Sequence, residues 1–185
     1  HRQAKAAKIF ETGATRLSTA APDRPFLKML ESPYPNPQDA GTALAWLAKA
    51  AALTVRDKQS PTIKRERVLA AWYNQPPDGP LASRLAKEVI AERGDRPIER
   101  GDLPMLYVLA RSLGNDATGR TTAIERYAEI LNLLEQEPSP GADDVAPLEL
   151  YEKVVGPAVT LADGLSGPGR LKEDQRRRVG SVYAA

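Results

Sequence analysis

The stretch Asp102–Glu137, DLPMLYVLARSLGNDATGRTTAIERYAEILNLLEQE, decides the fold class of this chain. Apolar residues recur every three or four positions up to Gly114, and they do so again from Ala117 to Glu135. That period is typical of amphipathic helices, and the polar residues Asn115–Asp116 between the two runs mark a short connector. Helices joined by a short connector pack as antiparallel neighbours. The stretch therefore predicts a helical hairpin.

The rest of the chain also has the composition and spacing of helices. Helix-forming residues dominate, and no segment of six or more residues alternates apolar and polar side chains as a strand would. Helix starts are expected where proline follows a capping residue, and Gly94 is expected to end a helix. We predict an all-α protein of antiparallel helix pairs. They form either a short right-handed superhelix, as in a repeat solenoid, or an ordinary helical domain. The expected capping residues are Asn36, Ser60, Asp78 and Asp102.

Helical spacing also predicts which side chains share a face. Gly156–Pro157 is expected to interrupt a helix, because proline lacks the amide hydrogen that a helix interior needs. Residues 164–169 are expected to form a loop before a basic helix. The residues expected on shared faces are Ile9, Phe10, Gly13 and Leu17 in the first helix, and Leu44, Leu47, Ala48 and Ala51 in the helix after Pro37.

The length of the chain and its proline-rich segments suggest the domain organisation. The 185 residues suffice for one helical domain over 1–185, with proline-rich linkers at 32–37 and 138–143 as possible internal boundaries. The chain begins at His1 rather than methionine and ends without a polar tail, so we expect it to be part of a longer chain. It contains no run of the roughly 18 apolar residues that a transmembrane helix requires.

The charge balance argues against a dedicated nucleic-acid binder. The chain has 26 basic and 24 acidic residues, a formal net charge of +2, and the two signs alternate along the predicted helices. Nucleic-acid binders usually carry a larger basic excess on one face. The absence of cysteine excludes disulfides and thiol chemistry. It fits the cytoplasm and the bacterial periplasm equally, so it leaves the localisation open.

The chain lacks the residues that several kinds of catalytic and metal sites require. His1 is the only histidine, so a catalytic triad and a multi-histidine metal site are both excluded. Asp143–Asp144 and Glu135–Glu137 are acidic pairs, and we interpret them as helix caps and surface charge. Residues 164–169 are glycine-rich but lack the spacing of a phosphate-binding loop. We therefore expect no catalytic residue, no cofactor and no metal.

Three segments share a sequence pattern in which an aromatic residue follows a small residue by three or four positions. They are Asp39–Ala51, Thr121–Leu131 and Asp144–Val155. A small residue lets two helices approach closely, and the aromatic ring fills the space left between helix pairs. This pattern resembles the second helix of tetratricopeptide and Sel1-like repeats, and Leu106–Gly114 resembles the first. The resemblance implies a scaffold that holds partner proteins, as in bacterial secretion assemblies.

The sequence thus favours a non-catalytic protein–protein interaction or scaffold module, a subunit of a larger bacterial assembly. Two alternatives stay open. One is a nucleic-acid-associated helical domain that uses Arg176–Arg178 with Lys64, Arg65 and Arg67. The other is an accessory domain of an enzyme whose active site lies elsewhere. The residues predicted to bind a partner are Trp46, Trp72, Tyr73, Tyr107, Tyr127, Arg176, Arg177 and Arg178.

Overall fold

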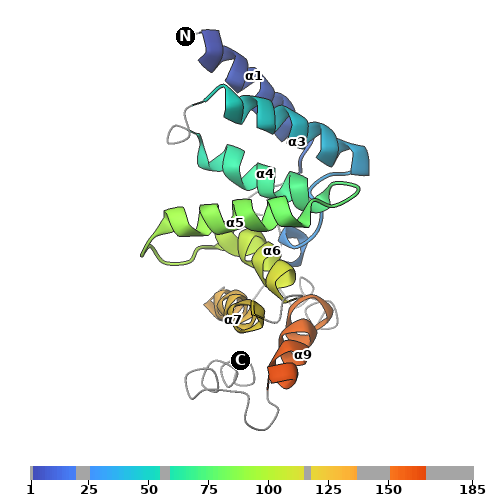
Figure 1. Cartoon of the computed structure of the whole chain (residues 1–185), viewed down its shortest axis with the longest axis vertical. Coiled ribbons are helices and arrows are strands. Elements are labelled where there is room, and N and C mark those ends of the chain that lie inside the picture. Colours follow the sequence, from blue (N-terminus) through green and yellow to red (C-terminus); the bar gives the residue numbers. More distant parts are fainter. Residues whose placement is uncertain (1, 20–25, 55–58, 115–117, 137–150, 166–185) are drawn as a thin grey trace. The chain divides into compact units, whose positions relative to one another are not determined.

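The computed structural model describes residues 2–19, 26–54, 59–114, 118–136 and 151–165. All regular secondary structure in these residues is helical, which confirms the predicted all-α fold (Figure 1). The chain divides into two compact units. Unit 1 comprises His1–Asp23 and Glu31–Asp95, and unit 2 comprises Arg24–Leu30 and Arg96–Ala185.

Unit 1 is a row of four helices: α1 (Arg2–Arg16), α3 (Pro37–Ala52), α4 (Pro61–Tyr73) and α5 (Gly79–Arg93). The helix α1 packs on α3, α3 on α4, and α4 on α5, so each helix of unit 1 packs on the next helix of that unit. Figure 1 shows the chain direction alternating along this row. The predicted antiparallel pairs are therefore present in unit 1.

Most of the predicted helix caps of unit 1 are formed. The Ser60 hydroxyl accepts a hydrogen bond from the Ile63 amide at 3.2 Å, and the Asp78 carboxylate accepts one from the Leu81 amide at 3.0 Å. Gly94 follows α5 with a φ of 62°, a backbone conformation that favours glycine. Asn36 differs, because its side chain makes no bond to the backbone amides of α3. Its amide group donates instead to Asp39 Oδ2 at 2.9 Å, within the first turn of the helix.

Alanine makes much of the interface between these helices. Since alanine has no side chain beyond Cβ, the helix axes can approach closely. The prediction for α1 needs correction, because Ala7 and Ala14 are its buried residues and Ile9 is 71% exposed. In α3, Leu47 and Ala51 are buried as expected, whereas Leu44 is half-buried and Ala48 is exposed. The other buried residues of α3 are Ala40, Ala43 and Ala50.

Unit 2 contains α2 (Phe26–Met29), a 3-10 turn η2 (Arg100–Asp102), α6 (Leu103–Leu113), α7 (Arg120–Gln136), a π-helical turn η3 (Tyr151–Val155) and α9 (Gly156–Leu165). The helix α6 packs on α7, which confirms the predicted hairpin, and α7 packs on α9. The connector is longer than expected, since α7 starts at Arg120 rather than Ala117.

One local prediction in unit 2 is confirmed only in position, and another is wrong. Asp102 occupies the expected N-cap position before α6. Asp102 does not cap α6 with its side chain; its carboxylate accepts a hydrogen bond from the Glu99 amide at 3.1 Å and so closes the turn η2. Gly156–Pro157 does not interrupt the helical path either, because η3 runs directly into α9. Proline is tolerated there because it lies at the second position of α9, where its missing amide hydrogen has little consequence.

The remaining predictions about organisation stay predictions. They are the single domain, the superhelix and the repeat array. The predicted linker at 32–37 leads into α3 within unit 1, and the one at 138–143 lies outside the described residues. The basic helix expected after residue 169 lies outside them as well. None of the helices in the described ranges is both long and apolar enough to span a membrane.

Candidate functional site: a groove beside Trp46

A groove in unit 1 lies along α3 and reaches the end of α4. Its volume is about 600 Å³. Of the residues predicted to bind a partner, Trp46 is the one that lines it. The lining residues are Pro37, Gln38, Gly41, Thr42, Ala45, Trp46, Lys49, Asn74 and Gln75.

The lining of the groove follows from the amphipathic character of α3. Gln38, Thr42, Ala45 and Lys49 recur at three- or four-residue intervals, so they share one face of the helix. The opposite face carries the buried alanines and Leu47 that pack in the core of unit 1. The groove is therefore the solvent side of a helix whose other side is fixed by packing.

A glycine allows the end of α4 to close the groove. A Cβ atom at Gly41 would lie 2.9 Å from Asn74 Oδ1, closer than such contacts occur, so a larger residue would make the Asn74 side chain shift. The connector after α4 is held in place by a hydrogen bond from the Asp78 amide to the Ala71 carbonyl, at 2.9 Å. These contacts place Asn74 and Gln75 beside the first turns of α3.

The half-buried ring of Trp46 is held by α1. A Cβ atom at Gly13 would lie 2.6 Å from Trp46 Cζ3, so the indole ring lies directly on the backbone of α1. Lys49, one turn further along α3, places its ammonium group 5.5 Å from the centre of the Phe10 ring, within the range of a cation–π contact. The result is a fixed aromatic wall with a positive charge beside it.

The other predicted aromatic residues do not join Trp46 in the groove. Trp72 and Tyr73 are half-buried near the end of α4, and Tyr107 is half-buried in α6 of unit 2. Tyr127 is 1% exposed and belongs to the core of unit 2, so its ring is not available to a partner. Burial raises the pKa of Tyr127 to about 12, although Arg111 acts in the opposite direction. Arg176, Arg177 and Arg178 lie outside the described residues.

Two basic residues of α4, Lys64 and Arg67, lie near acidic residues. The Lys64 ammonium group forms an ion pair with Glu92 of α5. Arg67 is half-buried and lies near Glu88, and burial lowers its pKa. Within the described residues, no group of three or more histidine or acidic side chains is placed to hold a metal ion.

A buried carboxyl group lies elsewhere in unit 1. Glu66 of α4 is 9% exposed, and burial raises its pKa, while hydrogen bonds with Tyr34 and Ser18 lower it. Tyr34 precedes α3, and Ser18 follows α1. Neither Glu66 nor Tyr34 lines the groove, so we assign the pair to the packing of unit 1.

Comparisons with models of protein families, with curated proteins and with solved structures gave no match for this chain. The assignment of a function therefore depends on the residues and contacts described above.

Sequence reasoning found Trp46 but missed its neighbours in the groove. A spacing signal for Gln38, Thr42 and Lys49 is present, since they recur on one face of a predicted helix. No comparable signal marks Asn74 and Gln75, because they reach the groove through the packing of α4 on α3.

Proposed function

We propose that this protein is a non-catalytic interaction module, which docks a partner protein in the groove beside Trp46. One observation carries the proposal: a half-buried tryptophan, fixed on the backbone of α1, forms part of the wall of a groove of about 600 Å³. Partly exposed tryptophan in a preformed groove is typical of the residues that dominate binding energy in protein interfaces.

The polar lining of the groove supports a partner that offers peptide groups. Gln38, Asn74 and Gln75 carry side-chain amides, each of which both donates and accepts hydrogen bonds. Because α3 and α4 are already packed, binding in the groove orders few further side chains and so loses little conformational entropy. The resemblance to tetratricopeptide and Sel1-like repeats points to the same class of function.

The nucleic-acid alternative receives less support from α4. Lys64 is paired with Glu92, and Arg67 is half-buried near Glu88. These acidic neighbours reduce the positive charge that a phosphate backbone would meet. We therefore favour a protein partner.

Photo-crosslinking tests this proposal, and α3 offers a matched pair of positions. Ala45 and Ala48 are both exposed alanines of α3, but only Ala45 lines the groove. A photoreactive amino acid at position 45 is expected to capture one partner protein in the native host, and the same group at position 48 is not. The purified partner should then bind the protein directly in calorimetry.

Two further variants keep this test decisive. Trp46→Ala is expected to abolish the adduct, and Thr42→Arg should do the same by filling the groove from an exposed position. Circular dichroism checks that both variants remain helical. Equal capture from positions 45 and 48, or an adduct that survives Thr42→Arg, contradicts the assignment of the groove.

A further inference from the structure

We propose that the outer face of α1 is a second docking surface, which binds an acidic helix of a partner protein. The surface comprises Arg2, Lys5, Ile9 and Arg16, which we call the α1 strip. It lies on the face of α1 opposite the buried Ala7 and Ala14, and it shares no residue with the groove beside Trp46. The proposal therefore goes beyond the function assigned to that groove and is tested separately.

The helical period aligns these four residues. Positions 2, 9 and 16 are separated by seven residues and position 5 lies between them, so at 3.6 residues per turn they form one narrow stripe along α1. Ala7 and Ala14, which are also seven residues apart, are buried on the other side of the helix. All four residues of the strip are exposed, and Ile9 is 71% exposed.

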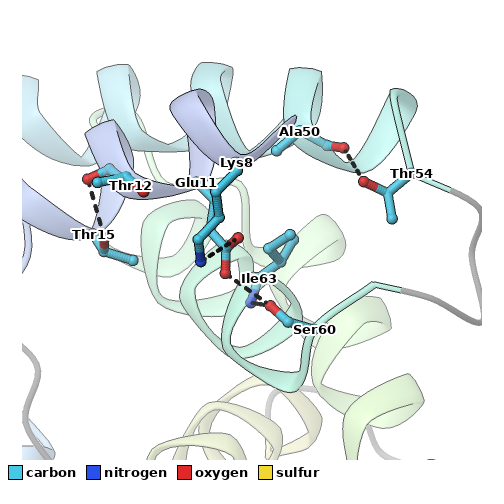
Figure 2. A network of polar contacts seen from close by, with 8 residues as sticks. All are labelled: Lys8, Glu11, Thr12, Thr15, Ala50, Thr54, Ser60 and Ile63. Carbon is cyan, nitrogen blue, oxygen red and sulfur yellow. Dashed lines mark hydrogen bonds and ion pairs between the residues drawn. The ribbon is translucent and has the colours of Figure 1, made fainter. Parts of the chain in front are cut away.

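The strip carries three positive charges and no negative one. The only acidic residue of α1, Glu11, points away from the strip. Figure 2 shows its carboxylate bonded to the Ser60 hydroxyl at 3.0 Å and to the Lys8 ammonium group at 3.1 Å. Glu11 and Lys8 are thus paired with each other, which leaves the charge of Arg2, Lys5 and Arg16 facing solvent.

The chemistry of the strip selects its partner. Three cations favour an acidic surface through complementary charge. The exposed Ile9 at the centre requires an apolar group opposite it, which a protein offers and a phosphate backbone does not. A membrane is a poor fit, because an interfacial helix presents several large apolar residues and this stripe presents one. The strip is narrow and follows the axis of α1, so a second helix can lie beside it along its length.

A synthetic helical peptide of about the length of α1, with glutamates flanking a central isoleucine, is the probe for this surface. Fluorescence anisotropy of the labelled peptide, titrated with the whole chain, is expected to show saturable binding that weakens with salt. Lys5→Glu together with Arg16→Glu should weaken binding about tenfold, because two attractions become repulsions. Ile9→Ser should weaken binding at every salt concentration.

The matched control reverses two charges of α5 in the same unit. Arg84→Glu together with Lys87→Glu changes the net charge equally, both residues are exposed, and the peptide affinity should change little. Equal losses in the two double variants would show that only net charge matters, and would overturn the proposal. Two other results would do so as well: no saturable binding of the peptide, or binding of a DNA duplex that competes with the peptide and is insensitive to Ile9→Ser.

Discussion

The Tyr34 hydroxyl donates a hydrogen bond to Glu66 Oε2 over 3.2 Å, and both residues are buried in unit 1. The connector that carries Tyr34 is also bonded to the end of α1. The Thr19 amide and hydroxyl both donate to the Pro33 carbonyl, at 2.7 and 2.8 Å. The connector is thus tied to α1 on one side and to α4 on the other.

Glu66→Gln is expected to change how stability depends on pH. Burial raises the pKa of the folded Glu66 carboxyl above its ordinary value of 4.5. As pH rises from that value toward the raised pKa, the unfolded chain releases a proton that the folded chain retains. The free energy of unfolding therefore falls across this window and then levels off. Glutamine does not titrate, so the variant should gain stability relative to the native protein as pH rises.

Urea denaturation followed by tryptophan fluorescence measures this effect, because both tryptophans, Trp46 and Trp72, lie in unit 1. Tyr34→Phe is the complementary variant. It removes a hydrogen bond that lowers the pKa of Glu66, so the decline should extend to higher pH, and the unfolding free energy should drop by about 1 kcal/mol. Parallel stability curves for Glu66→Gln and the native protein would show that Glu66 titrates normally.

Gly13→Ala is expected to destabilise unit 1 and displace the ring of Trp46. The new Cβ atom would lie 2.6 Å from Trp46 Cζ3, so the ring must move. Such overpacking costs about 1–3 kcal/mol, which exceeds the roughly 1 kcal/mol that alanine gains over glycine within a helix. The emission of Trp46 should shift to longer wavelength. Gly79→Ala is the control, since nothing lies within 4 Å of its added Cβ atom, and it should be neutral or slightly stabilising.

Ser60→Ala is expected to loosen α1 from the start of α4. The Ser60 hydroxyl accepts from the Ile63 amide at 3.2 Å and donates to Glu11 Oε1 at 3.0 Å, as Figure 2 shows. Loss of a helix cap costs about 0.5–2 kcal/mol. Glu11 also places a carboxylate at the positive end of the α4 dipole, where a negative charge is favourable.

A double-mutant cycle isolates this link between the helices. Ser60→Ala and Glu11→Ala are expected to show a coupling energy of at least about 0.5 kcal/mol in urea denaturation. Asp78→Ala removes an exposed cap whose carboxylate bonds the Leu81 amide, and it should cost less than Ser60→Ala. Additive effects of Ser60→Ala and Glu11→Ala would contradict the link.

Local chemistry made much of the fold predictable. Helix starts at Ser60 and Asp78 depend on hydrogen bonds to nearby backbone amides, and the helix end at Gly94 depends on its backbone angle. These features involve neighbouring residues alone. The hydrogen bond of Asp102 was not predictable in this way. Its carboxylate could accept from an amide of α6 or from the amide of Glu99, and it accepts from Glu99. Sequence patterns therefore located the helices better than they located the bonds at each end.

Which side chains of a helix are buried was harder to predict, because it depends on the face that the helix packs against its neighbour. Ile9 was expected to share the packed side of α1, yet Ala7 and Ala14 form that side, because small residues allow α1 and α3 to approach closely. For the groove, Trp46 was predictable as an aromatic candidate. Its contact with Gly13, and the approach of Asn74 to Gly41, join segments distant in sequence and follow only from tertiary packing.

The row of helices in unit 1 has a consequence for how the chain reaches its native state. The main contacts join each helix of unit 1 to the next helix of that unit, from α1 to α3, α4 and α5. The connectors from α3 to α4 and from α4 to α5 are short, closing such loops costs little entropy, and proteins rich in local contacts fold fast. During synthesis, each helix of unit 1 can dock on the one before it as it leaves the ribosome, without waiting for the residues that follow α5.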